Sequence, residues 1–466
     1  MKRCRINKRH WLQNLFKIKK ILNFRIMWIN FFICLSLFAL MMSTNQWLLA
    51  IPIAILIVYI ACINFKFMWL IWLCLFIWFI FWNIHHYIYL INWYEYKDVV
   101  NGRYTVIDIT EKNVYIQDQY LRKLVVWKSD LYPDITLYSQ FYASGKLMPM
   151  DYNSNYYASN NIYYILKVTH YTRLENWWNV RHWFFKYYLQ KDLDYYQLII
   201  PLLFGFNIQV HNNIIESLKD MGAVHLIVVS GLHFATIYGL IKLLTIKIDK
   251  SKILCTILII IYFFFVKKSI SVFRAFTFLL IQQFLIKKHW HHRISLHQIL
   301  FWISFVYLLY SPKNVLNLGY WLSFILTFSL VLYSQGQAKI EEEKQKNITY
   351  MKALYLLKIY FLSWFLSVTI ISVQQHAFSI LSFLYILFLT PIFQFAIIFF
   401  AIFFPLTFIC SPISYLLSRL ISLLHSFNLR VEIPHSNYLL ILYVLDYTIL
   451  LKQSLIYKKS ETRKYN

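Results

Sequence analysis

The sequence predicts a polytopic α-helical membrane protein with a small extracytoplasmic antiparallel β domain. Hydrophobic residues make up 59% of the 466 residues, and charged residues make up only 14%. Apolar runs long enough to cross a bilayer recur along most of the chain. Residues 95–172 break this pattern, because apolar and polar residues alternate there with the period of a strand. A soluble domain cannot bury so much apolar surface, so soluble protein classes are excluded.

The chain is strongly basic, with 46 Lys and Arg against 20 Asp and Glu and a formal net charge of +26. Such an excess suits anionic lipid headgroups, positively charged cytoplasmic loops or a polyanionic substrate. Composition alone does not choose among these. None of the six cysteines lies in the β domain, so we expect no disulfide there.

Residues 1–94 form a basic N-terminal tail followed by three spans, at 26–43, 47–63 and 67–91. The tail is rich in Lys and Arg, which places it in the cytoplasm, and no small-residue cleavage site follows the first apolar run. We therefore read the first span as an uncleaved helix. Three crossings place the following β domain outside.

The β domain shows strand-like alternation at 103–110, 114–118, 124–129 and 135–147, separated by turn signals such as Asn101-Gly102 and Pro133-Asp134. Five or six antiparallel strands are expected. A partly open, OB-like (oligonucleotide-binding-like) barrel fits this size. Aromatic residues alternate with basic ones in the middle of the domain and are candidates to stack bases and contact phosphates. These candidate DNA-binding residues are Arg122, Lys123, Trp127 and Lys128. The alternative is that the aromatic residues only build the barrel core.

Residues 173–197 are rich in Trp, Tyr and Phe with interleaved Arg181, Lys186 and Lys191, too polar to span a membrane. This composition favours an amphipathic helix lying in the membrane interface. A partner-binding helix is the alternative.

Residues 198–457 contain ten further apolar segments, followed by a short cytoplasmic tail at 458–466. The segments are 198–210, 223–246, 252–266, 270–286, 294–310, 314–334, 353–373, 377–404, 405–425 and 437–452. The first is too short to cross, and the fold class therefore has about 10–13 spans with both termini cytoplasmic. Pro391 is a point where one span can divide into two. Gln335–Asn347 is expected to be a solvated loop. The pair Lys267-Lys268 is the one basic pair that this count places outside.

The most informative stretch is Gly222-Ala-Val-His225-Leu-Ile-Val-Val-Ser230-Gly231-Leu-His233. Four of the eight glycines in the chain lie between 205 and 239. Glycine permits close backbone approach and local unwinding, and polar side chains at membrane depth are costly and often functional. His225 and His233 differ by about 80° around an ideal helix, so they share a face only if the segment bends. Interhelical hydrogen bonding is the alternative role for these residues.

This stretch, with Pro201-Leu-Leu-Phe-Gly205 and Ile215–Asp220 before it, resembles the hallmark of the ComEC family of competence DNA-uptake channels. Later segments resemble further family motifs in the same order. These are Ser271-Val-Phe-Arg274-Ala275, Ser311-Pro312 and Leu318-Gly319-Tyr320-Trp321-Leu322-Ser323-Phe324. The N-terminal helices and the β domain, with Asp151-Tyr152, Tyr156 and Asn161-Ile162, resemble the family's outer module. The resemblance is strong over 200–335 and weaker elsewhere.

The resemblance implies a plasma-membrane channel that conducts single-stranded DNA into the cytoplasm during natural transformation. The residues that it places along the DNA path are Gly222, His225, Ser230, Gly231, His233 and Arg274. Besides single-stranded DNA and membrane lipid, the implied partners are a DNA receptor, a separate nuclease, a cytoplasmic helicase-type motor and a second copy of the chain. No cofactor is implied.

Two departures from the family concern its C-terminal part. Many members continue into a metallo-β-lactamase-like nuclease domain, which we do not expect here. An asparagine that the family often places before the proline at Pro391 is absent. The cluster His289-Trp290-His291-His292 lacks an acidic residue, so we read it as a solvated basic loop and expect no metal site.

No Gly-rich phosphate loop or Gly-x-Ser-x-Gly elbow is present, so we expect the protein not to be an enzyme. The alternatives are a membrane-bound nuclease or other polymer-processing enzyme, and a drifted, non-conducting remnant of the channel family. Metal-dependent nuclease activity in the purified protein would distinguish the enzyme from the channel.

Overall fold

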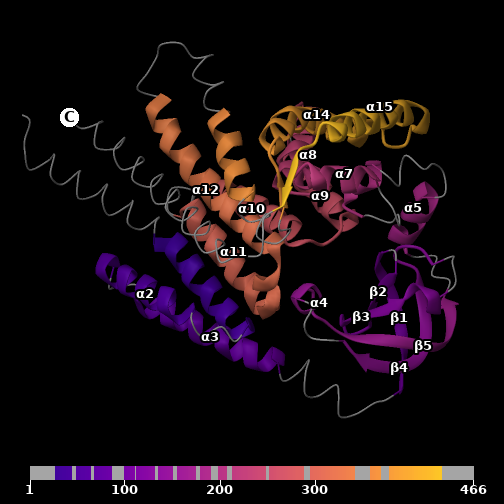
Figure 1. Ribbon diagram of the computed structural model, residues 1–466, viewed down its shortest axis with the longest axis horizontal. Helices are drawn as coiled ribbons and strands as arrows, with labels where there is room; N and C mark the ends of the chain where they lie inside the picture. Colours follow the sequence, from indigo (N-terminus) through magenta and orange to yellow (C-terminus); the bar gives the residue numbers. More distant parts are fainter. Residues whose placement is uncertain are drawn as a thin grey trace, which may run out of the picture. The chain divides into compact units, whose positions relative to one another are not determined.

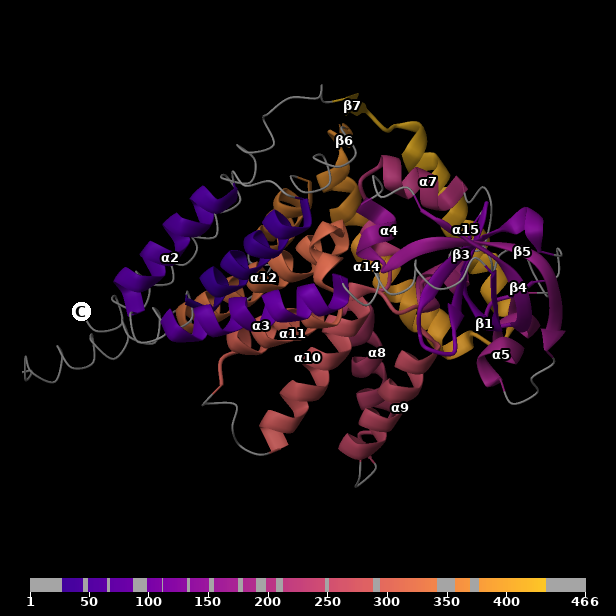
Figure 2. The ribbon, with the colours of Figure 1, turned by 90° about the horizontal axis from the view of Figure 1, so that it is seen from below.

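The computed structural model describes fourteen segments of the chain (Figures 1 and 2). They are 27–44, 49–64, 68–86, 99–110, 112–131, 135–150, 155–174, 179–189, 198–206, 213–247, 251–287, 294–341, 357–368 and 377–432. The chain divides into two compact units. The first unit comprises Met1–Trp82, Ile281–His376 and Ile433–Asn466, and the second comprises Asn83–Leu280 and Ala377–Glu432.

The first unit is helical. Its described elements are the helix Met27–Thr44, α2 (Ala50–Asn64), most of α3 (Met68–His86), α11 (Leu296–Tyr310), the 3₁₀ turn η7 (Pro312–Leu316), α12 (Leu318–Glu341) and the helix Leu357–Val368. Aromatic rings fill its core: Phe32 packs on Tyr320 and on Phe328, with ring centroids 5.9 and 4.9 Å apart. The Tyr320 hydroxyl shares a buried hydrogen bond of 2.9 Å with Ser36. These contacts hold the first helix against α12.

The second unit contains a closed five-stranded barrel with the order β1-β2-β3-β5-β4. Its strands are β1 (Val99–Ile109), β2 (Asn113–Asp118), β3 (Lys123–Trp127), β4 (Gln140–Pro149) and β5 (Ile162–Leu174). All neighbours are antiparallel except β3 and β5, which are parallel. A short helix, α4 (Asn155–Ser159), connects β4 to β5. The OB-like barrel is therefore present, but closed rather than partly open, and the segment expected as one strand at 135–147 becomes a strand only from Gln140.

A glycine fixes the contact between β4 and β5. A Cβ atom built on Gly145 would lie 2.2 Å from the carbonyl oxygen of Lys167, so no other residue fits there without moving the strands. The register of the two strands shifts between Ser144 and Gly145. Such a bulge bends the strands and helps a five-stranded sheet to close.

The barrel packs on the helices of its own unit through α5 (Val180–Leu189). The backbone carbonyl of Tyr138 accepts a hydrogen bond of 2.6 Å from Asn179 at the start of this helix. Phe185 is fully buried against Tyr138 on the barrel side and Phe204 on the helix side. Of the segment expected to lie in the membrane interface, α5 is the part that the structure describes as a helix.

The remaining helices of the second unit surround the Gly222–His233 stretch. They are α6 (Ile200–Phe204), α7 (Asn213–Asp220), η6 (Val224–Leu226), α8 (Gly231–Leu244), α9 (Ser251–Phe265), the first part of α10 (Ile270–Lys287), α14 (Ser382–Phe403) and α15 (Thr407–Ser426). Helix α8 lies beside α9 and α14, and α7 lies beside α15 (Figure 2). Two short strands, β6 (Ala377–Ser379) and β7 (Arg430–Glu432), pair with each other.

Four described stretches are long and apolar enough to cross a membrane: Met27–Thr44, Val224–Leu244, Ser382–Phe403 and Thr407–Ser426. Six shorter apolar helices of 10–17 residues accompany them within the described residues. Most expected spans therefore correspond to an apolar helix, although many are shorter than expected. The segment 437–452 and the cluster at His289–His292 lie outside the described residues.

Three expectations about the helices need correction or completion. The apolar segment 223–246 is not one helix, since Ile227–Ser230 separates η6 from α8. The solvated loop expected over Gln335–Asn347 is wrong as far as Glu341, because α12 continues to that residue through residues that favour a helix, and 342–347 lie outside the described residues. Pro391 does not divide its span, and α14 continues through it.

Candidate functional site

The site begins where α7 ends, at Gly222. The Ala223 amide donates to the Leu218 carbonyl at 2.7 Å, and the Gly222 amide donates to the Lys219 carbonyl at 3.0 Å. This is the Schellman pattern, in which the residue after the helix adopts a left-handed conformation. Gly222 has φ 73°, and a Cβ atom there would lie 3.1 Å from the Cβ of Ser382. Glycine is required here by its φ angle and by the close approach of α14.

The chain then forms η6, which contains His225, and loses helical structure over the next four residues. His225 is partly buried, and its ring interacts with the backbone of Gly222. Val228 in the break is 45% exposed, whereas its neighbours Ile227 and Val229 are buried. The interruption therefore separates His225 from His233 structurally, and the two do not lie on one continuous helix.

Ser230 begins α8 as its N-cap. Its Oγ accepts a hydrogen bond of 3.2 Å from the Leu232 amide. Its own amide donates to Nδ1 of His233 at 3.3 Å, and its Oγ lies 3.2 Å from the same nitrogen. The arrangement is a capping box in which histidine takes the place that Glu or Gln usually holds.

The capping box also orients the ring of His233, because Nδ1 accepts a hydrogen bond from the Ser230 amide. The ring is fully buried. The backbone carbonyl of Leu202 interacts with the ring. Within the described residues, however, Nε2 has no partner at hydrogen-bonding distance and angle.

Arg274 of α10 lies at the same turn. A Cβ atom placed on Gly231 would be 3.0 Å from Nη2 of Arg274 and 3.9 Å from the Cβ of Ala275. The Arg274 side chain is 9% exposed, so the guanidinium is held inside the protein against the first residue of α8. The partial positive charge of a helix N-terminus and a full cation thus lie side by side, an arrangement that favours an anion.

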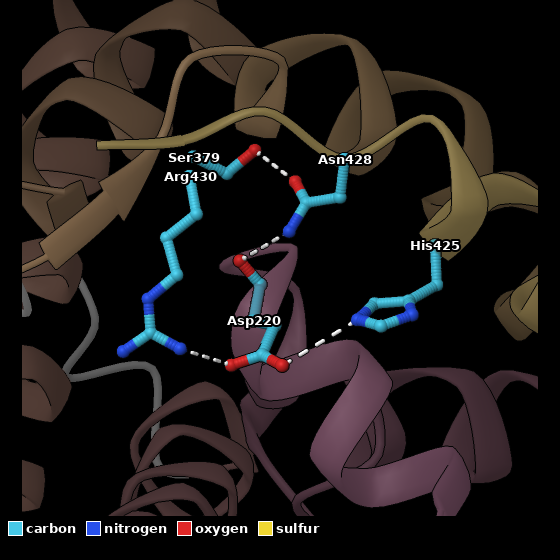
Figure 3. Close-up of polar contacts among 5 residues, drawn as sticks. All are labelled: Asp220, Ser379, His425, Asn428 and Arg430. Atoms are coloured by element: carbon cyan, nitrogen blue, oxygen red, sulfur yellow. Dashed lines mark hydrogen bonds and ion pairs between the residues drawn. The ribbon is translucent and has the colours of Figure 1, made fainter. Parts of the chain in front are cut away.

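A polar cluster that the sequence did not reveal joins the end of α7 to the segment after α15 (Figure 3). The Asp220 carboxylate pairs with Arg430 at 2.7 Å and lies 3.4 Å from Nε2 of His425. Asn428 donates to the backbone carbonyl of Asp220 at 3.1 Å and accepts from Ser379 at 2.6 Å. We call these five residues the Asp220 clasp. Its members are separated by up to 210 residues, so no local pattern could have predicted it.

The clasp fixes the helix that precedes Gly222. Asp220 is two residues before the left-handed turn, and the other clasp residues come from β6, the end of α15, the segment that follows α15 and β7. The two strands are themselves paired, with Ser379 opposite Arg430. The C-terminal part of the second unit therefore positions the start of the Gly222–His233 stretch.

The candidate DNA-binding residues of the barrel lie at opposite ends of β3. Arg122 pairs with Asp118 at 2.8 Å and lies over the Tyr120 ring, 4.8 Å from its centroid. Trp127, 38% exposed, and Lys128 lie at the other end of the strand. The four residues do not form one cluster.

Lys123 faces the helices of the unit rather than open solvent. Burial lowers the pKa of its amine, the nearby Lys267 lowers it further, and Asp108 raises it. Lys267 itself, in the turn between α9 and α10, pairs with Asp108 of β1 at 2.5 Å. The basic pair Lys267-Lys268 thus lies at the barrel end of α9.

The described residues include no group of three or more His, Cys, Asp or Glu side chains placed to hold a metal ion. The site therefore consists of a helix break, a capping box and a buried arginine. Its polar groups suit contact with an anion.

Comparison with known proteins identifies the region that holds this site. Residues 202–449 match the family described as "Competence protein". No curated protein and no solved structure matches the chain. The family match covers more than half of the 466 residues and includes the Gly222–His233 stretch, Arg274 and the Asp220 clasp. The chain therefore belongs to the competence protein family.

Proposed function

We propose that the protein is a plasma-membrane channel that conducts single-stranded DNA inward during natural transformation. Membership in the competence protein family gives it a role in DNA uptake. The observation that carries the channel proposal is the break before α8, where Arg274 lies against Gly231. A polyanionic strand needs polar groups at membrane depth, and the apolar helices around this point offer few others.

The chemistry of the break suits passage rather than tight binding. A broken helix exposes amide dipoles without adding many fixed charges, as half-helix ends do in transporters. The turn brings one arginine, Arg274, against the first residue of α8. Many fixed cations would hold the strand in place, because each contact with a phosphate adds affinity. One arginine at a polar turn is consistent with a strand that keeps moving.

The barrel is proposed to receive the strand outside the membrane, with both termini of the chain in the cytoplasm. A separate nuclease would supply the single strand, a DNA receptor would deliver the duplex, and a helicase-type motor would pull the strand inward. We propose no catalytic residue and no cofactor. Incubating the purified protein with DNA and divalent metal is the direct check, and cleavage above background would favour the nuclease alternative.

The channel is tested by uptake of labelled DNA into the cytoplasm. We compare wild type, a gene deletion, His225→Ala and Arg274→Ala at equal membrane levels. The matched control is Arg419→Ala, because Arg419 is an arginine of α15 that contacts Tyr415 at the protein surface. Surface binding of DNA without entry is expected in the deletion, in His225→Ala and in Arg274→Ala, with normal entry in Arg419→Ala. Normal entry in the deletion would refute the channel.

A further inference from the structure

Three strands of the barrel present one continuous outer surface. Antiparallel pairing places Arg103 of β1 opposite Tyr142 of β4, and Tyr142 opposite Thr172 of β5. The adjacent row is Asn101, Ser144 and His170, and beyond it Lys146 lies opposite Lys167. We call these eight residues the β1–β4–β5 face. All are exposed except Ser144, which is partly buried.

The residues between them point inward, as strand alternation requires. Tyr104, Phe141, Ala143 and Leu166 are almost fully buried in the barrel core. The β1–β4–β5 face is therefore outside the barrel along its whole length. Tyr142 in its centre is 48% exposed, a large aromatic ring left open on a polar surface.

The β1–β4–β5 face carries positive charge that nothing on it balances. The only acidic residue on the three strands is Asp108, which is buried and paired with Lys267. Arg103 donates to the neutral amide oxygen of Gln140, which orients the guanidinium and leaves its charge intact.

Two of the positively charged side chains on this face are direct neighbours across a strand pair. Lys146 and Lys167 lie directly opposite across β4 and β5, an arrangement that destabilises a sheet. No ion pair joins either lysine to an acid in the described part of the chain. A polyanion lying across both strands would turn this repulsion into attraction.

On the β2–β3 side of the barrel the middle of the outer face is covered. Tyr115 of β2 and Val125 of β3 are buried on the outside of the sheet beneath Met150 and Ile162, with Tyr157 of α4 packed on the cluster. The chain itself covers the middle of the outer face of these two strands, and Trp127 at the end of β3 stays exposed. Arg122 at their hairpin already has its charge balanced by Asp118.

The β1–β4–β5 face extends from the lysine pair toward the part of the barrel that packs on the helices. From Lys146 to Gln140 the strand covers about 20 Å, at about 3.3 Å per residue. Gln140 follows Tyr138 and Ser139 directly, and Tyr138 holds the start of α5. One end of the face therefore lies at the lysine pair, and the other reaches the part of the barrel that packs on the helices.

We infer that the β1–β4–β5 face binds a segment of single-stranded DNA. Tyr142 stacks on a base, and Arg103, Lys146 and Lys167 contact phosphates. Stacking on an exposed aromatic ring beside a track of cations is how proteins bind single strands without regard to sequence. The inference rests on the proposed function for its substrate, and it adds the surface by which the barrel receives the strand.

The test measures binding of a fluorescent oligo(dT) of about 16 nucleotides, the upper site size of one such barrel. The full-length protein is held in discs of zwitterionic lipid, and anisotropy is followed between about 50 and 200 mM salt, the range over which phosphate contacts reveal themselves. Tyr142→Ala is expected to weaken binding about tenfold. Lys146→Gln with Lys167→Gln is expected to reduce the slope of log K against log salt by about 1.4, about 0.7 for each lysine.

Conservative variants separate binding from folding. Tyr142→Phe keeps the ring, and Lys146→Arg with Lys167→Arg keeps the charge, so both are expected to bind as wild type does. Tyr120→Ala is the matched aromatic control, since Tyr120 is 66% exposed on the β2–β3 hairpin. Wild-type affinity in Tyr142→Ala, or an equal loss in Tyr120→Ala, would overturn the inference. A wild-type protein that does not bind the oligonucleotide would overturn it too. Each of these results would leave the uptake experiment to decide the channel.

Discussion

The guanidinium of Arg274 lies so close to Gly231 that a single methyl group at that glycine would stand 3.0 Å from Nη2. The two residues are 43 positions apart and belong to different helices, α8 and α10. Their contact connects two sequence motifs, Ser230-Gly231 and Ser271–Ala275, at one point in space. It also explains why the position after the N-cap has no side chain.

Gly231→Ala is expected to displace Arg274 and leave the fold intact. The atom in its way is the end of a flexible side chain, so the helix need not move. DNA uptake should fall at least tenfold, while the amount of protein in the membrane stays normal. Gly239→Ala in the same helix is the control, because a Cβ there meets nothing within 4 Å. Equal uptake in the two variants would show that the position of Arg274 does not matter.

Gly222→Ala, unlike Gly231→Ala, is expected to lower the stability of the fold. A residue with a Cβ in the left-handed region costs about 1–2 kcal/mol, and the approach of Ser382 adds to this. The midpoint of thermal unfolding in detergent should fall, and Ser382→Gly in the same protein should restore only part of it. Full restoration would mean that the backbone conformation carries no strain.

The Asp220 clasp predicts which of two substitutions, Asp220→Asn or Asn428→Ala, lowers stability more. Asp220→Asn removes the partly exposed ion pair with Arg430 and changes the contact with His425, and such surface pairs contribute about 0–1 kcal/mol. It keeps the backbone carbonyl that Asn428 binds. Asn428→Ala loses that hydrogen bond and leaves Ser379, which is buried, without its partner. We expect Asn428→Ala to be the more destabilising of the two by thermal unfolding; the reverse order would make the ion pairs dominant.

In the ion pair between Lys267 and Asp108, removing the lysine is expected to cost more stability than removing the carboxylate. Lys267→Met leaves the carboxylate of Asp108 buried beside the barrel, whereas Asp108→Asn leaves an amine that is partly exposed and can be hydrated. The first change is expected to cost about 1–3 kcal/mol and the second less than about 1 kcal/mol. Limited proteolysis of the barrel at rising temperature measures both. Equal sensitivity would imply that Lys123 replaces Lys267 as the partner of Asp108.

Lys146→Glu is expected to change stability and binding in opposite directions. A Glu opposite Lys167 replaces repulsion with attraction, which stabilises a strand pair by about 0.2–1 kcal/mol. The same change places a negative charge in the path of the phosphates. Thermal unfolding should shift upward while affinity for oligo(dT) falls. A variant that is more stable and binds equally well would show that the lysines serve no ligand.

The barrel was predictable because it depends on local chemistry, since alternating β-branched residues indicate strands. The helix break was only permitted by the sequence: the glycines of the Gly222–His233 stretch allow local unwinding, but they do not fix where the helix ends and restarts. The extent of α12 was misjudged, since the polar residues from Gln335 to Glu341 suggested a loop although most of them favour a helix. The Asp220 clasp was out of reach, because the three residues that Asp220 contacts lie more than 200 positions away.

The order of the strands also governs how the barrel can form during synthesis. Strand β5 is the partner of both β3 and β4, so each of those strands keeps an open edge until Leu174 has left the ribosome. At about 5–20 residues per second, the stretch from Trp127 to Leu174 takes about 2–9 seconds. During that interval the apolar strand Lys123–Trp127 can pair with the wrong segment or with another chain. Slower translation of the segment before β5 would lengthen this exposure, so the yield of folded protein should depend on the speed of synthesis there.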